Sequence, residues 1–141
     1  MYVTNKLFAQ NTAQATSSTG SIVASGGILA QKQIRSNQDI VAFSSSDITL
    51  KENISPIQNA LDKVMSLTGN VFSWKPEAIE LGNEGMDTGI LAQEVEALGL
   101  PGITTTRKDG HKAVRYERLI PVLIEAVKEL TAKVKSLESN K

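Results

Sequence analysis

The chain has no cysteine and only one histidine among its 141 residues, and these two absences exclude several kinds of site. Without cysteine there can be no disulfide framework, no thiolate zinc site and no cysteine nucleophile. The single histidine, His111, leaves little scope for a histidine-based metal site or a Ser-His-Asp triad. The remaining chemistry belongs to serine, lysine and carboxylate groups, and we expect neither a metal nor another cofactor.

The sequence also lacks a charge excess and a long apolar run. Fifteen basic residues balance fifteen acidic ones, so no net positive field exists to hold a phosphate backbone, and we expect no nucleic-acid partner. No apolar stretch approaches the roughly 20 residues of a membrane helix, and residues 1–6 lack the hydrophobic core of a signal peptide. We therefore expect no membrane partner and a protein that is soluble where it is made, with one modest core.

Residues 1–46 are rich in small and polar side chains, carry few charges and show no helical apolar stripe. Isoleucines recur in this segment every six residues, at Ile22, Ile28, Ile34 and Ile40, and glycines at positions 20, 26 and 27 are candidate turn points. This period is typical of short strands that face a shared axis, and it predicts the end of a β-stalk. The alternative is a chance recurrence in a β-prone segment.

From Ser55 the pattern becomes helical. Ser55, Pro56 and Gln58 supply an N-cap, a first-turn proline and the second half of a capping box, so a helix is expected over residues 55–68. Its apolar face comprises Ile57, Leu61, Val64 and Met65. A strand is expected over residues 71–75, with Phe72 and Trp74 as core anchors.

Three further elements are predicted before residue 117. Residues 89–91 favour a short strand, and residues 92–98 favour a helix that ends before Gly99. The segments 103–107 and 111–116 flank Lys108-Asp109-Gly110, which is typical of a hairpin turn because glycine readily adopts a positive φ. Residues 47–116 therefore predict a small α+β domain.

A heptad pattern dominates the C-terminal segment and predicts a coiled-coil helix over about residues 119–138. Its seam residues are Ile120, Leu123, Val127, Leu130, Val134 and Leu137. Pro121 fits only near the first turn, so the helix should begin at Leu119 or Ile120. A lone helix cannot bury this seam, which favours self-association over packing within one chain. β-Branched residues at the a positions with leucine at the d positions by themselves favour a coiled coil of two helices.

Ser46 and Lys51 stand five residues apart in the segment that joins the predicted stalk to the domain. A lysine kept neutral by burial can accept the proton of a serine hydroxyl, so the spacing permits a Ser-Lys pair. Spacing alone is weak support, because a solvated linker would contain the same residue types.

Four separated blocks carry a resemblance to a known family. They are Ser46-Asp47 with Leu50-Lys51-Glu52-Asn53-Ile54, then Phe72-Ser73-Trp74, then residues 89–95, and finally residues 112–116 with 119–121 and 125–130. In this order they resemble the intramolecular chaperone auto-processing domain at the C-termini of bacteriophage tailspikes, tail fibres and endosialidases. The resemblance covers roughly residues 44–138.

The resemblance implies a homotrimeric chaperone, residues 47–141, that registers the upstream stalk of its own polypeptide and then cuts itself off. The nucleophile falls on Ser46 and the base on Lys51, and the expected cleavage site comprises Ser45, Ser46 and Asp47. Other motif positions are Asp47, Asn53, Gln93 and Glu94, for which turn-forming, capping or packing roles are the alternative.

The implied trimer overrides the dimer preference of the heptads, because a three-fold stalk would impose its symmetry on the helices. Assembly is expected in the host bacterial cytoplasm, with the stalk remaining in the virion tail as part of a longer fibre protein. Attack by the Ser46 hydroxyl on the Ser45 carbonyl needs only a five-membered ring, whereas a product that begins at Asp47 needs a hydroxyl from elsewhere. The alternative function is a permanently attached, uncleaved trimeric tip.

Overall fold

The computed structural model describes residues 26, 28, 30, 34, 36 and 37 and the continuous range 40–140. The chain divides into two units, residues 1–40 and residues 41–141. In the first unit Ile28, Ile34 and Ile40 are exposed and lie outside regular secondary structure, whereas Ile22 lies outside the described residues. The β-stalk therefore stays a prediction.

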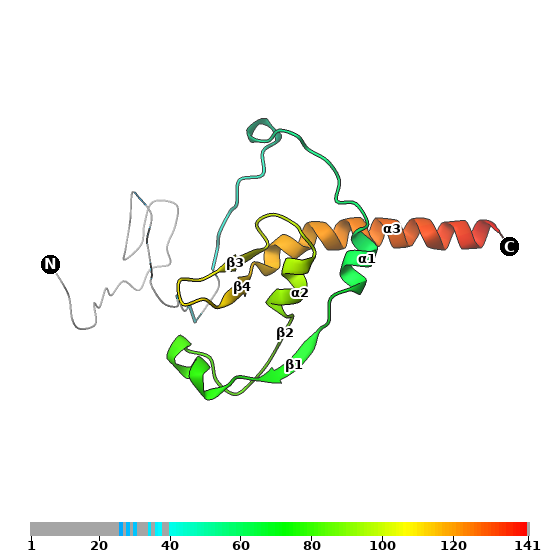
Figure 1. Cartoon of the computed structure of the whole chain (residues 1–141). Coiled ribbons are helices and arrows are strands. Elements are labelled where there is room, and N and C mark those ends of the chain that lie inside the picture. The colour runs from blue at the N-terminus through cyan, green and yellow to red at the C-terminus, as the bar shows by residue number, and fades with distance from the viewer. Residues whose placement is uncertain are drawn as a thin grey trace. The chain divides into compact units, whose positions relative to one another are not determined.

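The second unit is an α+β arrangement of short elements around one long helix (Figure 1). Its α-helices are α1 (Ala60–Met65), α2 (Ala92–Ala97) and α3 (Ile120–Ser139). Its strands are β1 (Asn70–Ser73), β2 (Met86–Gly89), β3 (Thr104–Thr106) and β4 (Lys112–Val114). Short 3-10 helices are η1 (Ile48–Leu50), η2 (Pro76–Leu81) and η3 (Tyr116–Leu119).

The buried core of the described residues is small and draws on all three α-helices. It comprises Ala60, Val95, Ile103, Val122 and Ala126. Half-buried apolar side chains around it include Ile57, Leu61 and Val64, which share the predicted face of the first helix. Alanines at two of the five buried positions allow α1 and α3 to approach closely, and these helices make the most extensive contact between elements.

Helix α1 begins at Ala60, five residues later than the capping pattern predicts, and Met65 is exposed rather than part of the apolar face. The side chain of Gln58 donates to the Pro56 carbonyl and completes no capping box. The cap comes instead from Glu129 of α3, whose carboxylate oxygens each accept one backbone N–H, from Ala60 and Leu61, at 2.9 Å. A carboxylate distant in sequence thus decides where the helix starts.

Strands β1 and β2 form an antiparallel hairpin in which Phe72 is opposite Asp87. Phe72 and Trp74 make an edge-to-face contact with ring centroids 5.1 Å apart, and the Trp74 indole donates to Asp87. The prediction that these two rings anchor the core is wrong, because neither belongs to the buried cluster and Trp74 is exposed. The hairpin extends away from the core, so its aromatic residues pack on each other.

The segment after β2 also differs from its predicted form. The strand ends at Gly89 instead of spanning residues 89–91, and Tyr116 approaches that glycine so closely that a Cβ would lie 2.6 Å from the tyrosine oxygen. Helix α2 follows as predicted. The β3–β4 hairpin is confirmed as well, with Gly110 at a φ of +87° in its turn.

Helix α3 begins at Ile120 with Pro121 in its first turn, which confirms the predicted start. Val122 and Ala126 are buried against the rest of the unit. All six residues of the predicted seam are at least 46% exposed. No helix in the described part of the chain is both long and apolar enough to cross a bilayer.

We expect replacement of Glu129 by glutamine to lower the melting temperature by several degrees, because the amide loses the charge that favours the N-terminus of α1. The two backbone N–H groups lower the pKa of Glu129 in the folded state. Its contribution is therefore complete above the ordinary glutamate pKa and is lost as the pH falls through the lowered folded value.

Thermal unfolding at several pH values measures this effect, with Glu138→Gln as the control on the exposed end of the same helix. The difference between the wild type and Glu129→Gln should shrink at acid pH. Equal melting temperatures for the two variants at neutral pH would contradict the capping role.

Candidate functional site

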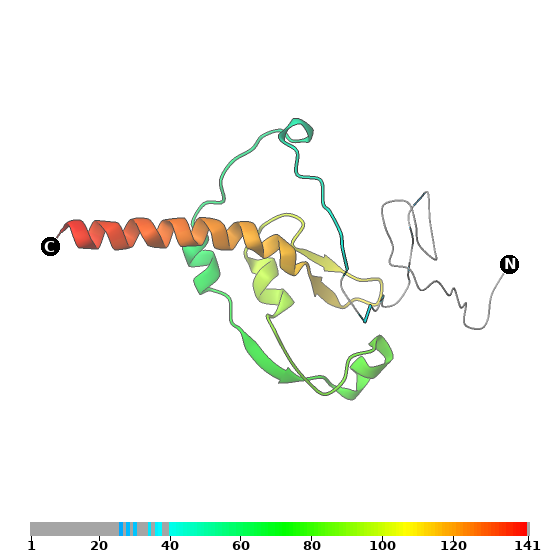
Figure 2. The same cartoon turned by 180° about the vertical axis from the view of Figure 1, so that it is seen from behind.

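The predicted reaction residues lie on an extended loop that precedes α1. Residues 41–59 run as an arch of chain away from the helices before they return at α1 (Figures 1 and 2). Helix η1 interrupts the arch with one tight turn, in which Leu50 N–H donates to the Asp47 carbonyl at 3.2 Å and Lys51 N–H to the Ile48 carbonyl at 3.1 Å. This turn reverses the chain between Ser46 and Lys51.

The structure brings Ser46 and Lys51 together, as the sequence predicts. The Nζ atom of Lys51 lies 2.9 Å from the Ser46 Oγ and 3.0 Å from the Ser46 carbonyl oxygen. Both distances are within hydrogen-bond range, and a nucleophile within reach of a base is the geometric requirement for an activated hydroxyl. The Lys51 amine therefore contacts both the Ser46 hydroxyl and the Ser46 carbonyl, which is part of the peptide bond between Ser46 and Asp47.

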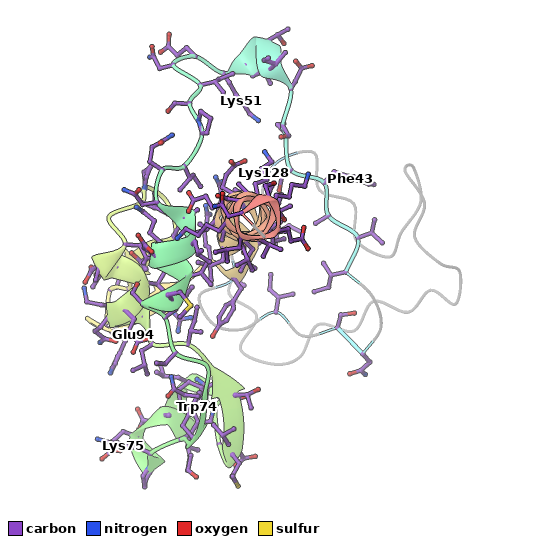
Figure 3. All side chains as sticks on the ribbon, turned by 90° about the vertical axis from the view of Figure 1, so that its right-hand side faces the viewer. Phe43, Lys51, Trp74, Lys75, Glu94 and Lys128 are labelled. Atoms are coloured by element: carbon purple, nitrogen blue, oxygen red, sulfur yellow. The ribbon has the colours of Figure 1, made fainter. Side chains whose placement is uncertain are left out.

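The site is open to solvent in the single chain. Ser45, Ser46, Asp47 and Lys51 are all exposed, and Figure 3 shows Lys51 on the arch, apart from Glu94 and Trp74. None of the residues of η1 is buried. The hydrogen bonds that join Ser46 to Lys51 and close the turn between them lie within residues 46–51.

Asp47 caps the turn between the two reaction residues. Its Oδ1 accepts hydrogen bonds from the Thr49 backbone N–H at 2.8 Å and from the Thr49 hydroxyl at 2.7 Å. These two bonds, the backbone one foremost, lower the pKa of Asp47, and the Lys51 cation adds a smaller effect in the same direction. The residues predicted from sequence do not include Thr49, although an aspartate two residues before a threonine is a known turn pattern.

The other motif positions do not join this pair. The Glu94 carboxylate accepts the Thr68 backbone N–H at 2.9 Å and the Thr68 hydroxyl at 2.8 Å, so it holds the segment that follows α1. Asn53 has a φ of +53°, the left-handed conformation of a turn residue. Gln93 lines a different part of the surface. The alternative roles in turns and packing therefore describe Asn53 and Glu94 better than a direct role in the reaction.

That surface is an open groove of about 900 Å³ between the two hairpins, and no motif in the sequence predicts it. Trp74, Arg107, His111 and Tyr116 are among its lining residues, whereas Ser46 and Lys51 are not. His111 is exposed and lies 3.4 Å from the Asp109 carboxylate. Among the described residues no three histidine, aspartate or glutamate side chains gather as a metal site.

Comparison with known proteins identifies the segment that contains the pair. Residues 46–104 match the family described as chaperone of endosialidase. The long tail fiber protein Gp37 of Enterobacteria phage K3 and that of Enterobacteria phage T2 are each 42% identical to this chain over 103 residues. Gp37 of Escherichia phage AR1 is 28% identical over 112 residues.

These matches cover most of this chain but a small part of each relative. The first two cover 69% of the chain and 8% and 7% of the relatives, and the third covers 77% and 10%. The family match begins at Ser46 itself and includes Lys51. The chain thus contains a domain of the chaperone-of-endosialidase family and is homologous to long tail fiber proteins of bacteriophages.

Proposed function

We propose that this chain is the C-terminal intramolecular chaperone of a phage tail fibre, which trimerises and registers its own β-stalk and then releases itself by autoproteolysis at Ser46. The observation that carries the proposal is the 2.9 Å approach of the Lys51 amine to the Ser46 hydroxyl within a domain of this family. The chain acts as a single-turnover serine endopeptidase on itself. It assembles in the host cytoplasm, and the stalk stays in the virion tail.

The Ser46–Lys51 pair supplies the proton transfer that such a reaction needs. A neutral Lys51 amine accepts the proton from the Ser46 hydroxyl as its oxygen attacks a carbonyl carbon. The resulting ammonium then gives that proton to the leaving backbone nitrogen. The peptide bond is exchanged for an ester, and water hydrolyses the ester to a carboxylate and a free hydroxyl.

Assembly supplies the environment that the single chain lacks. A lysine amine in water has a reference pKa of ~10.4 and holds its proton at neutral pH, whereas burial favours the neutral form that acts as a base. Both reaction residues are exposed when one chain stands alone. Neighbouring chains must therefore cover the pair before it reacts, and cleavage follows correct assembly.

The exposed side of α3 supports self-association. Val122 and Ala126 are buried on one side of the helix, whereas the predicted seam, with Leu123, Leu130 and Val134 among its members, is about half exposed or more. An apolar stripe along the helix needs a partner to leave water, and further copies of the same helix provide it by knobs-into-holes packing. Three copies of the helix would bury this stripe and would also match the three-fold symmetry of the proposed stalk.

Two bonds are candidates for cleavage, and Lys51 contacts groups that belong to each. Its contact with the Ser46 hydroxyl suits attack on the Ser45 carbonyl through a five-membered ring. Its contact with the Ser46 carbonyl oxygen would polarise the bond before Asp47, where another hydroxyl would have to attack. The two products differ by one serine residue, so mass spectrometry of the released fragment identifies the bond.

Replacement of either reaction residue should stop processing of the full chain. Ser46→Ala removes the nucleophile and should abolish the released fragment, and Lys51→Ala should slow its appearance roughly 10²- to 10⁴-fold because the base is lost. Denaturing electrophoresis over time measures both rates.

Matched controls for this experiment are Ser44→Ala and Lys108→Ala, which change exposed residues of the same types outside the pair. Both should be processed like the wild type. An assembled wild-type oligomer that remains intact would favour the uncleaved tip, and equal processing of Lys51→Ala and wild type would contradict the role of the amine.

A charge in the seam should prevent both assembly and cleavage. Val134→Asp places a carboxylate where three helices are proposed to meet, so the chain should sediment as a monomer and yield no released fragment. Ser136→Asp adds the same charge on an exposed position of the same helix and should leave both properties unchanged. Analytical ultracentrifugation measures the assembly state. A monomeric Val134→Asp chain that cleaves at the wild-type rate would show that cleavage does not depend on assembly.

A further inference from the structure

Thr49 lies between Ser46 and Lys51 in the sequence, and its hydrogen bonds go to Asp47 and not to the Ser46 hydroxyl or the Lys51 amine. Its backbone N–H and its hydroxyl both donate to the same oxygen of Asp47, at 2.8 and 2.7 Å. Asp47 directly follows Ser46 and is the N-cap of η1, so its carboxylate holds the start of the turn next to Ser46. The far end of that turn is Lys51, whose N–H is bonded to the Ile48 carbonyl.

This turn has no support from a packed core. None of its three residues is buried, and Ile48 and Leu50 are more than 70% exposed. A three-residue 3-10 helix held by two backbone bonds of 3.1 and 3.2 Å opens easily. Side-chain caps of the Asp47 type are the local interactions that favour the closed turn.

We propose that Thr49 is a positioning residue for autoproteolysis, because its two hydrogen bonds to Asp47 keep the turn closed and thereby hold the Lys51 amine against the Ser46 hydroxyl. This inference rests on the proposed function. Thr49 acts through the geometry of the turn and takes no proton in the reaction. The Lys51 cation attracts the Asp47 carboxylate across the turn.

Thr49→Val tests the role of the hydroxyl, because valine keeps the shape and the backbone N–H but loses the second hydrogen bond. In the assembled full chain the cleavage rate should fall roughly three- to tenfold, the range expected for a weakened cap. Thr49→Ser keeps a hydroxyl and should cleave within about twofold of the wild type. Thr106→Val, an exposed threonine of β3, is the matched control and should have no effect.

A second measurement reads the turn directly. In a chain made uncleavable by Ser46→Ala, carboxyl NMR should give an Asp47 pKa below its ordinary value, and addition of Thr49→Val should raise it. Sedimentation should show the same oligomer in every variant, so that a change in rate reports positioning and not assembly.

The outcomes separate this inference from the proposed function. If Ser46→Ala abolishes cleavage but Thr49→Val cleaves at the wild-type rate, the positioning role is overturned while the function stands. A Thr49→Ser chain as slow as Thr49→Val, or an Asp47 pKa that Thr49→Val leaves unchanged, also overturns it. If Ser46→Ala is processed like the wild type, the function fails and the positioning role fails with it.

Discussion

The architecture of residues 41–141 depends on one carboxylate, that of Glu129, and on the two backbone N–H groups of α1 that it accepts. A helix of six residues has too few internal hydrogen bonds to persist on its own, so outside contacts must hold it. Glu129 fixes its beginning from α3, and Glu94 fixes the segment after its end from α2. Because the arch that carries Ser46 and Lys51 ends at α1, the Glu129 carboxylate joins this loop to the long helix, whereas Glu94 joins the segment after α1 to α2.

Helix α3 has two different tasks on its two sides. One side packs Val122 and Ala126 into the core and presents Glu129 to α1. The other carries an apolar stripe that stays exposed in the part of the chain that the structure describes. The same helix therefore contributes both to the interior of each subunit and to the surface at which we propose that subunits meet.

The sequence predicts those parts of the fold whose causes are local. The start of α3 follows from Pro121 and the β3–β4 turn from Gly110, whereas the pairing of Ser46 with Lys51, which one short turn closes, is implied by the family resemblance and only permitted by the spacing. The start of α1 could not be found this way, because its cap lies 69 residues from Ala60 along the chain. The prediction that Phe72 and Trp74 anchor the core is wrong for a related reason. Hydrophobicity indicates a preference for burial but not the direction in which a hairpin extends.

The compactness of the reactive turn has an evolutionary consequence. Hydroxyl, amine and the cap between them occupy six successive positions, from Ser46 to Lys51. Insertions and deletions elsewhere in the gene, including those that change the length of the stalk that we propose to precede this turn, leave the register of these groups intact. The sequence before residue 46 can therefore vary during evolution while these six residues are inherited together as one short motif.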